Sequence, residues 1–202
     1  MQTTYQPPFE PATAAEALAR NSLDDALLRS IAAGDKSALQ VLFRRHSARI
    51  YRFALRLVEN SALAEDVVSE VFIDVWRGAG GFNGKSQVTT WLLAITRHKA
   101  NMALRRRPEA RLDDDIVAHL VDPSDDPEVV THQRDRGEII RACLNRLSPL
   151  HREVIDLVYY HEKSIGEAAQ IVGVSKNTVK SRMMHARRQM AKLLSITCVD
   201  AL

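Results

Sequence analysis

Apolar side chains recur at steps of three and four residues along most of this chain. The clearest stripe, between residues 37 and 58, consists of Leu39, Leu42, Phe43, Ile50, Phe53, Ala54 and Leu57. This spacing places the side chains on one face of an α-helix, and no long alternation of β-branched residues competes with it. Ala, Leu and Arg are the three most frequent residues, and all three favour helices. We therefore predict an all-α fold.

The same periodicity predicts four helices before Pro108 and four more between residues 138 and 194. The first begins near Asp24, the second covers 37–58, and the third covers about 61–77, after a capping Asn60 or Ser61. Four glycines within 78–84 predict a loop, and a fourth helix follows at about 86–107. Residues 1–22 contain three prolines and an Ala-rich stretch, so we expect a loosely ordered tail with a short helix near 16–20.

Charge divides the chain into three parts. Residues 1–107 hold 15 Lys and Arg against 10 Asp and Glu, residues 108–137 hold 3 against 9, and residues 138–202 hold 10 against 6. The net charge of +3 therefore conceals two basic segments around an acidic one. The acidic segment carries prolines and little apolar periodicity, as flexible linkers do. We predict two small helical domains, 23–107 and 138–196, joined by the linker 108–137, with tails at 1–22 and 197–202.

The strongest local motif lies between residues 164 and 194. A short helix at 165–171 precedes a turn at Gly173, a capping Ser175 and a longer helix, and small Ala168 and Ala169 allow the two helices to approach closely. That order is typical of a helix-turn-helix. Residues 176–192 hold six basic residues and no acidic one. We predict that this second helix binds DNA, with polar side chains near its start on base edges and Lys and Arg on phosphates.

Other classes of function have no matching pattern. Cys143 and Cys198 lie far apart without Cys or His at ligand spacing, so we expect a reduced, cytoplasmic protein without a disulfide or a metal site. No phosphate-binding loop, nucleophile elbow or His–carboxylate pairing appears, so we expect neither enzyme activity nor a cofactor or small-molecule substrate. No run of about 18 apolar residues and no basic residue before Arg20 occur, so we expect neither membrane insertion nor a secretory signal.

The second half of the chain resembles one family of transcription proteins. Residues 149–154 (PLHREV), 165–169 (IGEAA) and 177–183 (NTVKSRM) are similar to the −35-binding region of extracytoplasmic-function (ECF) sigma factors. Ser148, between Leu147 and Pro149, is a mild variant of the family's Leu-Pro pattern. The resemblance implies that the −35 element is contacted by Lys176, Asn177, Thr178, Lys180, Ser181, Arg182, His185 and Arg188.

The first half resembles the same family independently. Residues 64–76 (AEDVVSEVFIDVW) are similar to its core-polymerase-binding helix, and residues 82–86 (FNGKS) and 90–97 (TWLLAITR) to its −10-binding loop and helix. Two departures, Ser69 and His98, affect base preference more than membership. The implied core-polymerase contacts are Asp66, Glu70, Phe72, Asp74 and Trp76. The implied −10 contacts are Phe82, Asn83, Gly84, Lys85, Ser86, Arg97, Lys99 and Asn101.

The resemblance implies an alternative sigma factor. Its partners would be core RNA polymerase, through the coiled coil of the largest subunit and the flap, together with promoter DNA and an anti-sigma factor, which is often held at the membrane. Its action would be promoter recognition and DNA melting in a stress or envelope response. Some of these residues have an equally good structural explanation. Phe72 and Trp76 could belong to the hydrophobic core, Gly84 could simply form a turn, and the linker could be a plain tether. Trp91 is better explained as a core residue than as a DNA contact.

Two other classes of protein stay open at this point. An operator-binding regulator would combine the helix-turn-helix with a signal-binding N-terminal half, although an α/β fold is then expected there. A helical adaptor or antagonist would sequester a partner through the acidic helix 61–77, but it would not require six basic side chains on the last helix.

Overall fold

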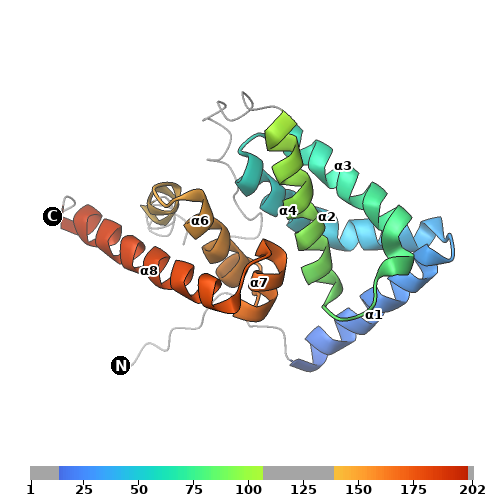
Figure 1. Ribbon diagram of the computed structural model, residues 1–202. Helices are drawn as coiled ribbons and strands as arrows, with labels where there is room; N and C mark the ends of the chain where they lie inside the picture. The colour runs from blue at the N-terminus through green and yellow to red at the C-terminus, as the bar shows by residue number, and fades with distance from the viewer. Residues whose placement is uncertain (1–13, 107–138, 200–202) are drawn as a thin grey trace, which may run out of the picture.

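The computed structural model describes residues 14–106 and 139–199, and both ranges are helical (Figure 1). The N-terminal domain, residues 14–106, contains α1 (Ala14–Ala32), α2 (Lys36–Val58), α3 (Ser61–Gly78), the 3-10 turn η1 (Ala79–Gly81) and α4 (Val88–Arg106). The C-terminal domain, residues 139–199, contains a helical segment at 139–145, α6 (Pro149–Ile155), the π-helical turn η4 (Asp156–Tyr160), α7 (Ile165–Val172) and α8 (Lys176–Val199). The all-α prediction is confirmed, while the predicted linker 108–137 lies outside the described residues.

The first helix begins earlier than the sequence analysis expected. Helix α1 starts at Ala14, so the short helix expected near 16–20 and the helix expected from about Asp24 form one continuous helix. The reason is composition: Ala14, Ala15, Ala17 and Ala19 have the highest intrinsic helix propensity. Apolar periodicity, which guided the prediction, does not detect a segment that is helical through propensity alone.

The N-terminal domain is built around the pairings of α2, α3 and α4. Leu42, Ile50, Val71, Val75 and Leu92 are almost fully buried in its core. The predicted start of α3 is confirmed, since the Asn60 side chain accepts a hydrogen bond from the Leu63 amide at 2.9 Å. Helix α1 is fastened to α2 by the buried Asp24 carboxylate, which lies 3.1 Å from Arg45 Nε and 2.9 Å from His46 Nε2. The loop 82–87, which leads into α4, is therefore attached to a packed helical domain.

The C-terminal domain contains the predicted helix-turn-helix. Ser164 caps α7 in a capping box, because its hydroxyl accepts from the Glu167 amide and the Glu167 carboxylate accepts from the Ser164 amide. Gly173 ends α7 in the left-handed region, at φ +70°. On α8 the side chains of Val179, Met183 and Ala186 are buried at 4% exposure or less. These three seat α8 against the rest of the domain and leave its other side for solvent.

Replacing Gly173 with Ala is expected to destabilise the protein by about 1–2 kcal/mol, because a Cβ raises the energy of the left-handed conformation. No atom lies within 4 Å of the added Cβ, so strain and not a clash is the cause. Urea unfolding followed by helical circular dichroism measures the change. The matched control is Gly166→Ala, where Gly lies inside α7 and the substitution should leave stability unchanged or raise it by up to about 1 kcal/mol.

The two domains pack directly on each other, which the sequence analysis did not predict. Helix α4 of the N-terminal domain lies against α7 of the C-terminal domain, and α2 contacts α6 (Figure 1). Phe53 of α2 and Leu93 of α4, each at most 1% exposed, belong to the same apolar cluster as Val154, Leu157 and Ala168. One apolar cluster is therefore shared by both domains.

Candidate nucleic-acid and polymerase interfaces

The first half of α8 presents most of the predicted −35 residues to solvent. Six of the eight are exposed, namely Lys176, Asn177, Lys180, Ser181, His185 and Arg188. Thr178 and Arg182 are half-buried. Thr178 is used locally, because its amide donates to Ser175 Oγ at 3.1 Å and its hydroxyl lies 2.9 Å from the same atom. Ser175 therefore caps the start of α8, and Thr178 is held in this cap through its amide and its hydroxyl.

Two side-chain pairs beside this surface, Arg187 with Tyr159 and His151 with His185, were not predicted from the sequence. Arg187 Nε donates to the Tyr159 hydroxyl at 3.0 Å, and its guanidinium lies 5.7 Å from the centre of the Tyr159 ring. Tyr159 is 56% exposed, so this pair holds a cation in place at the edge of α8. His151 of α6 stacks on His185, with ring centres 6.2 Å apart. No sequence pattern links these residues, because each pair joins α8 to a different turn of the chain.

The predicted −10 loop forms a short structured turn. Phe82 packs on Trp91 with ring centres 5.2 Å apart, and both rings lie against the core of the N-terminal domain. The Asn83 side chain accepts from the Lys85 amide at 3.1 Å, and Gly84 has a φ of +69°. Asn83, Gly84 and Lys85 are exposed. Phe82 thus anchors the loop, and the turn conformation at Gly84 is one that glycine adopts without strain.

The predicted DNA contacts on α4 are bound by carboxylates in this structure. Arg97 Nε lies 2.5 Å from Glu153 Oε1 of the C-terminal domain. Lys99 Nζ lies 2.9 Å from Asp74 and 3.5 Å from Glu70, both on α3. Asn101 is half-buried. Glu70 and Asp74, two of the predicted polymerase contacts, are therefore ion-paired with Lys99, a residue predicted to bind DNA.

The remaining predicted polymerase contacts on α3 divide between core and surface. Phe72 is only 6% exposed and packs in the core, with its ring centre 4.7 Å from that of Phe43. Trp76 is half-buried and Asp66 is exposed. Phe43, expected in the buried stripe of α2, is 43% exposed, and Ile73, not singled out before, is 48% exposed. The buried stripe of α2 is thus narrower than its apolar residues indicated.

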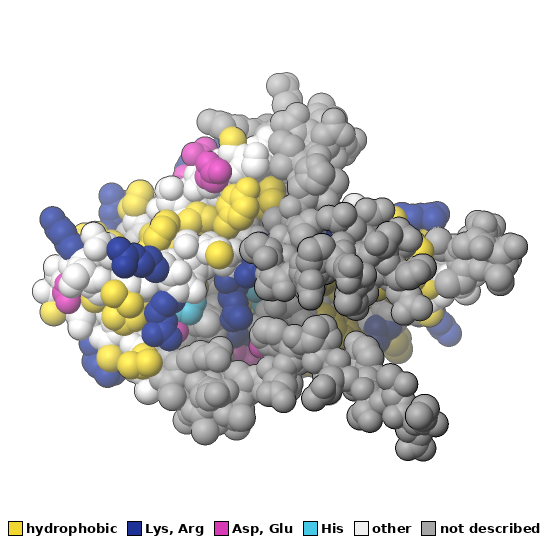
Figure 2. Space-filling view, turned by 180° about the vertical axis from the view of Figure 1, so that it is seen from behind, with side chains coloured by type: hydrophobic (Ala, Val, Ile, Leu, Met, Phe, Trp, Pro, Cys, Tyr) yellow, Lys and Arg dark blue, Asp and Glu magenta, His cyan; other side chains and the backbone are white. Residues whose placement is uncertain are grey.

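A shallow groove runs between α2 and α3 beside Ile73 and Trp76. It is lined by Leu39, Gln40, Phe72, Ile73, Trp76 and Arg77. We call these residues, together with Phe43, the α2–α3 groove. The face in Figure 2 shows exposed hydrophobic side chains lying among Lys and Arg side chains over the N-terminal domain. An apolar centre bordered by polar groups is the composition of a protein-binding surface.

Residues 14–106 and 139–199 contain neither a metal site nor a membrane-spanning helix. No group of three or more His, Cys, Asp or Glu side chains in these ranges is placed to hold a metal ion. None of the helices in the same ranges is long and apolar enough to cross a membrane. The fold and the basic α8 together define a DNA-binding protein of the helix-turn-helix class.

Comparison with known proteins gives the family. The family model for sigma-70 region 2 matches residues 42–109, and the model for sigma-70 region 4 matches residues 137–190. The ECF RNA polymerase sigma factor SigM of Mycobacterium tuberculosis is 33% identical over 174 residues, which are 85% of this chain and 84% of SigM. SigK of the same organism is 27% identical over 186 residues, 86% of this chain and 94% of SigK. The chain therefore belongs to the ECF sigma factors of the sigma-70 family.

Two solved structures share this fold, and one of them is described as a sigma factor. CnrH, in complex with the cytosolic domain of CnrY, superposes with a TM-score of 0.63 at 24% identity, over 86% of this chain and 98% of CnrH. RpoE of Bartonella quintana, in complex with the anti-sigma factor NepR, gives a TM-score of 0.58 at 24% identity, over 78% of this chain and 96% of RpoE. As a sigma factor, the protein binds core RNA polymerase and directs it to promoters.

Proposed function

We propose that the N-terminal half of α8 reads the −35 element. The observation that carries this assignment is the division of α8 between a buried side, with Val179, Met183 and Ala186, and an exposed side of basic and polar residues. The contacts are those predicted: Lys176, Asn177, Thr178, Lys180, Ser181, Arg182, His185 and Arg188. Lys and Arg neutralise phosphates, while the polar tips near the start of the helix read base edges.

The −10 element is assigned to the loop 82–87 and to α4. Exposed Asn83, Gly84 and Lys85 offer a backbone that a base removed from the stack can approach closely, which lowers the cost of melting. Phe82 and Ser86 flank this turn, and Phe82 fixes it to Trp91. The further contacts are Arg97, Lys99 and Asn101 of α4, the first two after exchange of their present carboxylate partners for DNA.

We assign the α2–α3 groove as the binding site for core polymerase. Exposed Ile73 and Phe43 and half-buried Trp76 supply its apolar surface. Asp66 is exposed on the same helix, and Glu70 and Asp74 would offer negative charge to a basic partner in exchange for Lys99. The Phe72 ring is buried, so its contribution is to pack against Phe43 and hold that exposed ring in position. The coiled coil of the largest subunit is the partner we assign to this groove, and the polymerase flap is assigned to the C-terminal domain.

We further propose control by an anti-sigma factor and action in the cytoplasm. The support is that CnrH and RpoE of the same fold are described in complexes with CnrY and with the anti-sigma factor NepR. The protein acts as an initiation factor and not as an enzyme, and an envelope or stress response is the proposed setting. An anti-sigma partner should co-purify with this chain from its own organism when a tagged chain is expressed from its native locus.

The test of the promoter assignment is run-off transcription with purified core polymerase and promoters from the source genome. Transcripts from discrete starts should require this protein. Arg188→Ala should weaken promoter binding by about 1–3 kcal/mol if Arg188 contacts a base, with a smaller, sequence-independent loss for a phosphate contact. Arg29→Ala, an exposed basic residue on α1, is the matched control and should change nothing.

Equal activity on intact promoters and on promoters with a scrambled −35 element would contradict the assignment of α8. Sequence-specific binding of duplex DNA without polymerase, with no transcripts in its presence, would favour the operator-binding regulator instead.

A further inference from the structure

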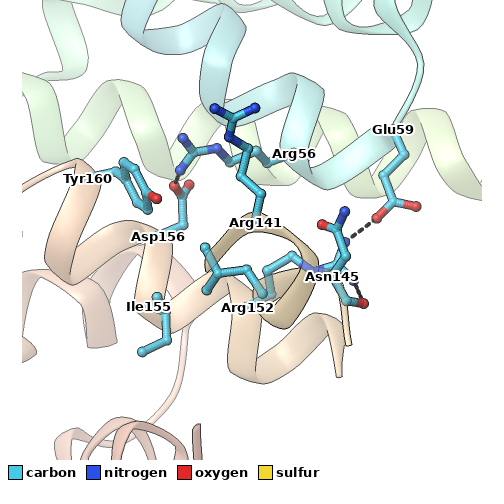
Figure 3. Close-up of a pocket in the computed structure, with 9 residues that line it drawn as sticks. Arg56, Glu59, Arg141, Asn145, Arg152, Ile155, Asp156 and Tyr160 are labelled. Carbon is cyan, nitrogen blue, oxygen red and sulfur yellow. Dashed lines mark hydrogen bonds and ion pairs between the residues drawn. The ribbon is translucent and has the colours of Figure 1, made fainter. Parts of the chain in front are cut away.

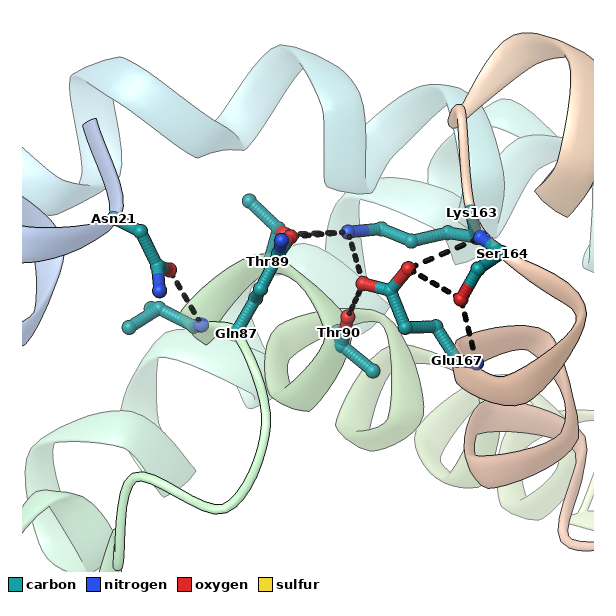
Figure 4. A network of polar contacts seen from close by, with 8 residues as sticks. Asn21, Gln87, Thr89, Thr90, Lys163, Ser164 and Glu167 are labelled. Atoms are coloured by element: carbon teal, nitrogen blue, oxygen red, sulfur yellow. Dashed lines mark hydrogen bonds and ion pairs between the residues drawn. The ribbon is translucent and has the colours of Figure 1, made fainter. Parts of the chain in front are cut away.

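Charged groups at the contact between the two domains are matched to partners within the chain. Arg56 pairs with Asp156, and its guanidinium lies 4.0 Å from the centre of the Tyr160 ring (Figure 3). Buried Lys163 donates to Thr89 Oγ1 at 2.6 Å in the polar network of Figure 4. Most basic side chains of α8 are instead exposed to solvent. The surface of α8 is therefore the one on which the chain presents positive charge outward.

Five exposed side chains form one stripe along α8. They follow one another at steps of three and four residues, and they are Asn177, Lys180, Ser181, Met184 and Arg188. At about 100° per residue they all lie within about 50° of a line that points almost directly away from the buried Val179. We call these five residues the exposed stripe of α8. It is the side of the helix opposite to its packed side.

Met184 lies at the centre of this stripe and is its one apolar member. Its side chain is 59% exposed, more than any other large hydrophobic side chain in residues 14–106 and 139–199 for which exposure is described. Exposed Lys180 lies one turn before it and exposed Arg188 one turn after it. Residues 176–192 include no acidic side chain. A polyanion bound by Lys180 and Arg188 would therefore also meet Met184, which is not among the −35 contacts predicted from the sequence.

The chemistry of the major groove selects a partner for this side chain. Hydrogen-bond donors and acceptors make up most of the base edges there, and the C5-methyl group of thymine is the apolar exception. The thioether of Met184 has no N–H or O–H to donate and is only a weak acceptor. Packed against a polar edge it would remove water from that edge without replacing the lost hydrogen bonds. Packed against a methyl group it buries apolar surface on both sides.

The length of the helix allows Met184 to reach a base. Met184 lies about 12 Å along the axis from Lys176, at 1.5 Å per residue, and the major groove is about 12 Å wide. Successive members of the exposed stripe advance by about 4.5–6 Å, which is between one and two base-pair steps. The flexible side chain of Met adapts to small differences in this fit. Met184 therefore has access to one base pair, or to two adjacent ones.

We propose that Met184 is a specificity-determining residue of the −35 contact, and that it selects thymine through the C5-methyl group. The inference rests on the proposed assignment of α8 to the −35 element. Lys180 and Arg188 hold the helix on the DNA, and Met184 adds a preference for T·A over base pairs whose edges are polar. The −35 element of this protein accordingly contains a thymine whose methyl group faces α8.

The test removes single methyl groups from the promoter. The full-length chain is bound to core polymerase, and the promoter is one that run-off transcription has identified. Each thymine of the −35 element, on either strand, is replaced singly by deoxyuridine, which pairs identically and lacks only the C5-methyl group. Promoter affinity should fall by about three- to tenfold at one position or at two adjacent positions, and elsewhere in the element it should change by less than about twofold.

Variants of Met184 assign this loss to the side chain. In Met184→Ala the affinity for the intact promoter should fall by a similar factor, and deoxyuridine should have no further effect. Met184→Leu remains apolar and should keep most of the methyl dependence, whereas Met184→Gln keeps the length of the side chain and should lose it. Leu23→Ala is the matched control, because Leu23 is 55% exposed on α1, and it should retain the full methyl dependence.

Two results would overturn the role of Met184. One is an unchanged affinity at every deoxyuridine position with the unaltered chain. The other is a methyl dependence that persists undiminished in a Met184→Ala chain whose circular dichroism shows intact helices. Failure of the −35 assignment itself is recognised separately, because a promoter with a scrambled −35 element would then bind as well as the intact one.

Discussion

Replacing Ile73 with Asp is expected to weaken binding of core RNA polymerase by roughly 30-fold or more. Ile73 is 48% exposed on α3 and lies in the α2–α3 groove beside Trp76, so its side chain is available to a partner. Truncation of an apolar anchor at the centre of an interface costs about 2 kcal/mol or more, and a buried unpaired carboxylate adds its own desolvation. Titration of labelled protein with core polymerase gives the dissociation constant.

The same substitution at Val41 is the matched control. Val41 lies on α2, is 43% exposed, and is not among the residues that line the groove. Val41→Asp should therefore leave the affinity within about twofold of the unchanged chain, because surface substitutions away from contacts have small effects. Equal losses for both variants would mean that the groove is not the polymerase site. Neither variant should lose helical content, since both side chains are largely exposed.

Mild acid is expected to open the docked structure of the free protein. His161 is 4% exposed, and its ring meets the Phe53 ring of α2 edge-on, with centres 5.2 Å apart. Burial, followed by the positive charges around it, lowers the pKa of His161 from 6.5 to about 3. The charged groups that face the imidazole are Arg49, Arg52 and Arg56 of α2, Asp156 of η4, and Lys163.

Acid should weaken the docking of the two domains because the buried imidazole of His161 is neutral in the docked state. The docked state requires the uncharged ring, so docking has its full strength above the ordinary pKa of about 6.5 and weakens as the pH falls towards 3. Between about pH 6 and pH 5 the open fraction should rise by up to about tenfold, which corresponds to about 1.4 kcal/mol per pH unit.

The response is measured as the distance between two fluorescent dyes, attached at the exposed positions Ala33→Cys and Ala191→Cys, from pH 7.5 to pH 5.0. His161→Phe keeps a ring against Phe53 but cannot take up a proton, and the pH dependence in this range should disappear. His185→Phe, on the exposed side of α8, is the control for a surface histidine and should retain it. A response that is unchanged in His161→Phe would assign the titration to another group.

Much of the fold follows from the sequence because helices are local. The third and fourth helices, the glycine loop and the helix-turn-helix all lie where apolar periodicity, capping residues and Gly173 indicated them. The first helix was predicted too short, because the alanines between 14 and 19 show propensity without periodicity. The family could also be inferred, since its motifs consist of consecutive residues.

The site was less predictable because its important contacts are not local. Lys99 and Asp74 are 25 positions apart in the sequence, and Arg97 and Glu153 are 56 apart. No helical projection brings these groups together. The exposed Phe43 was assigned to the core stripe, because periodicity identifies which residues share a face but not how far the neighbouring helix covers that face. For the same reason the packing of the two domains on each other was not foreseen.

The interface between the domains can be weak and still keep the chain closed, because both partners belong to one polypeptide. A covalent connection of 32 residues gives an effective concentration on the order of 1 mM for the two domains. Separate domains that associate with a dissociation constant of only about 0.1 mM would then be docked in roughly nine chains of ten. A partner that binds one separated domain with nanomolar affinity loses only about tenfold to the competition. The contact between α4 and α7 can thus keep the two domains docked in most free chains, and a specific partner can still separate them.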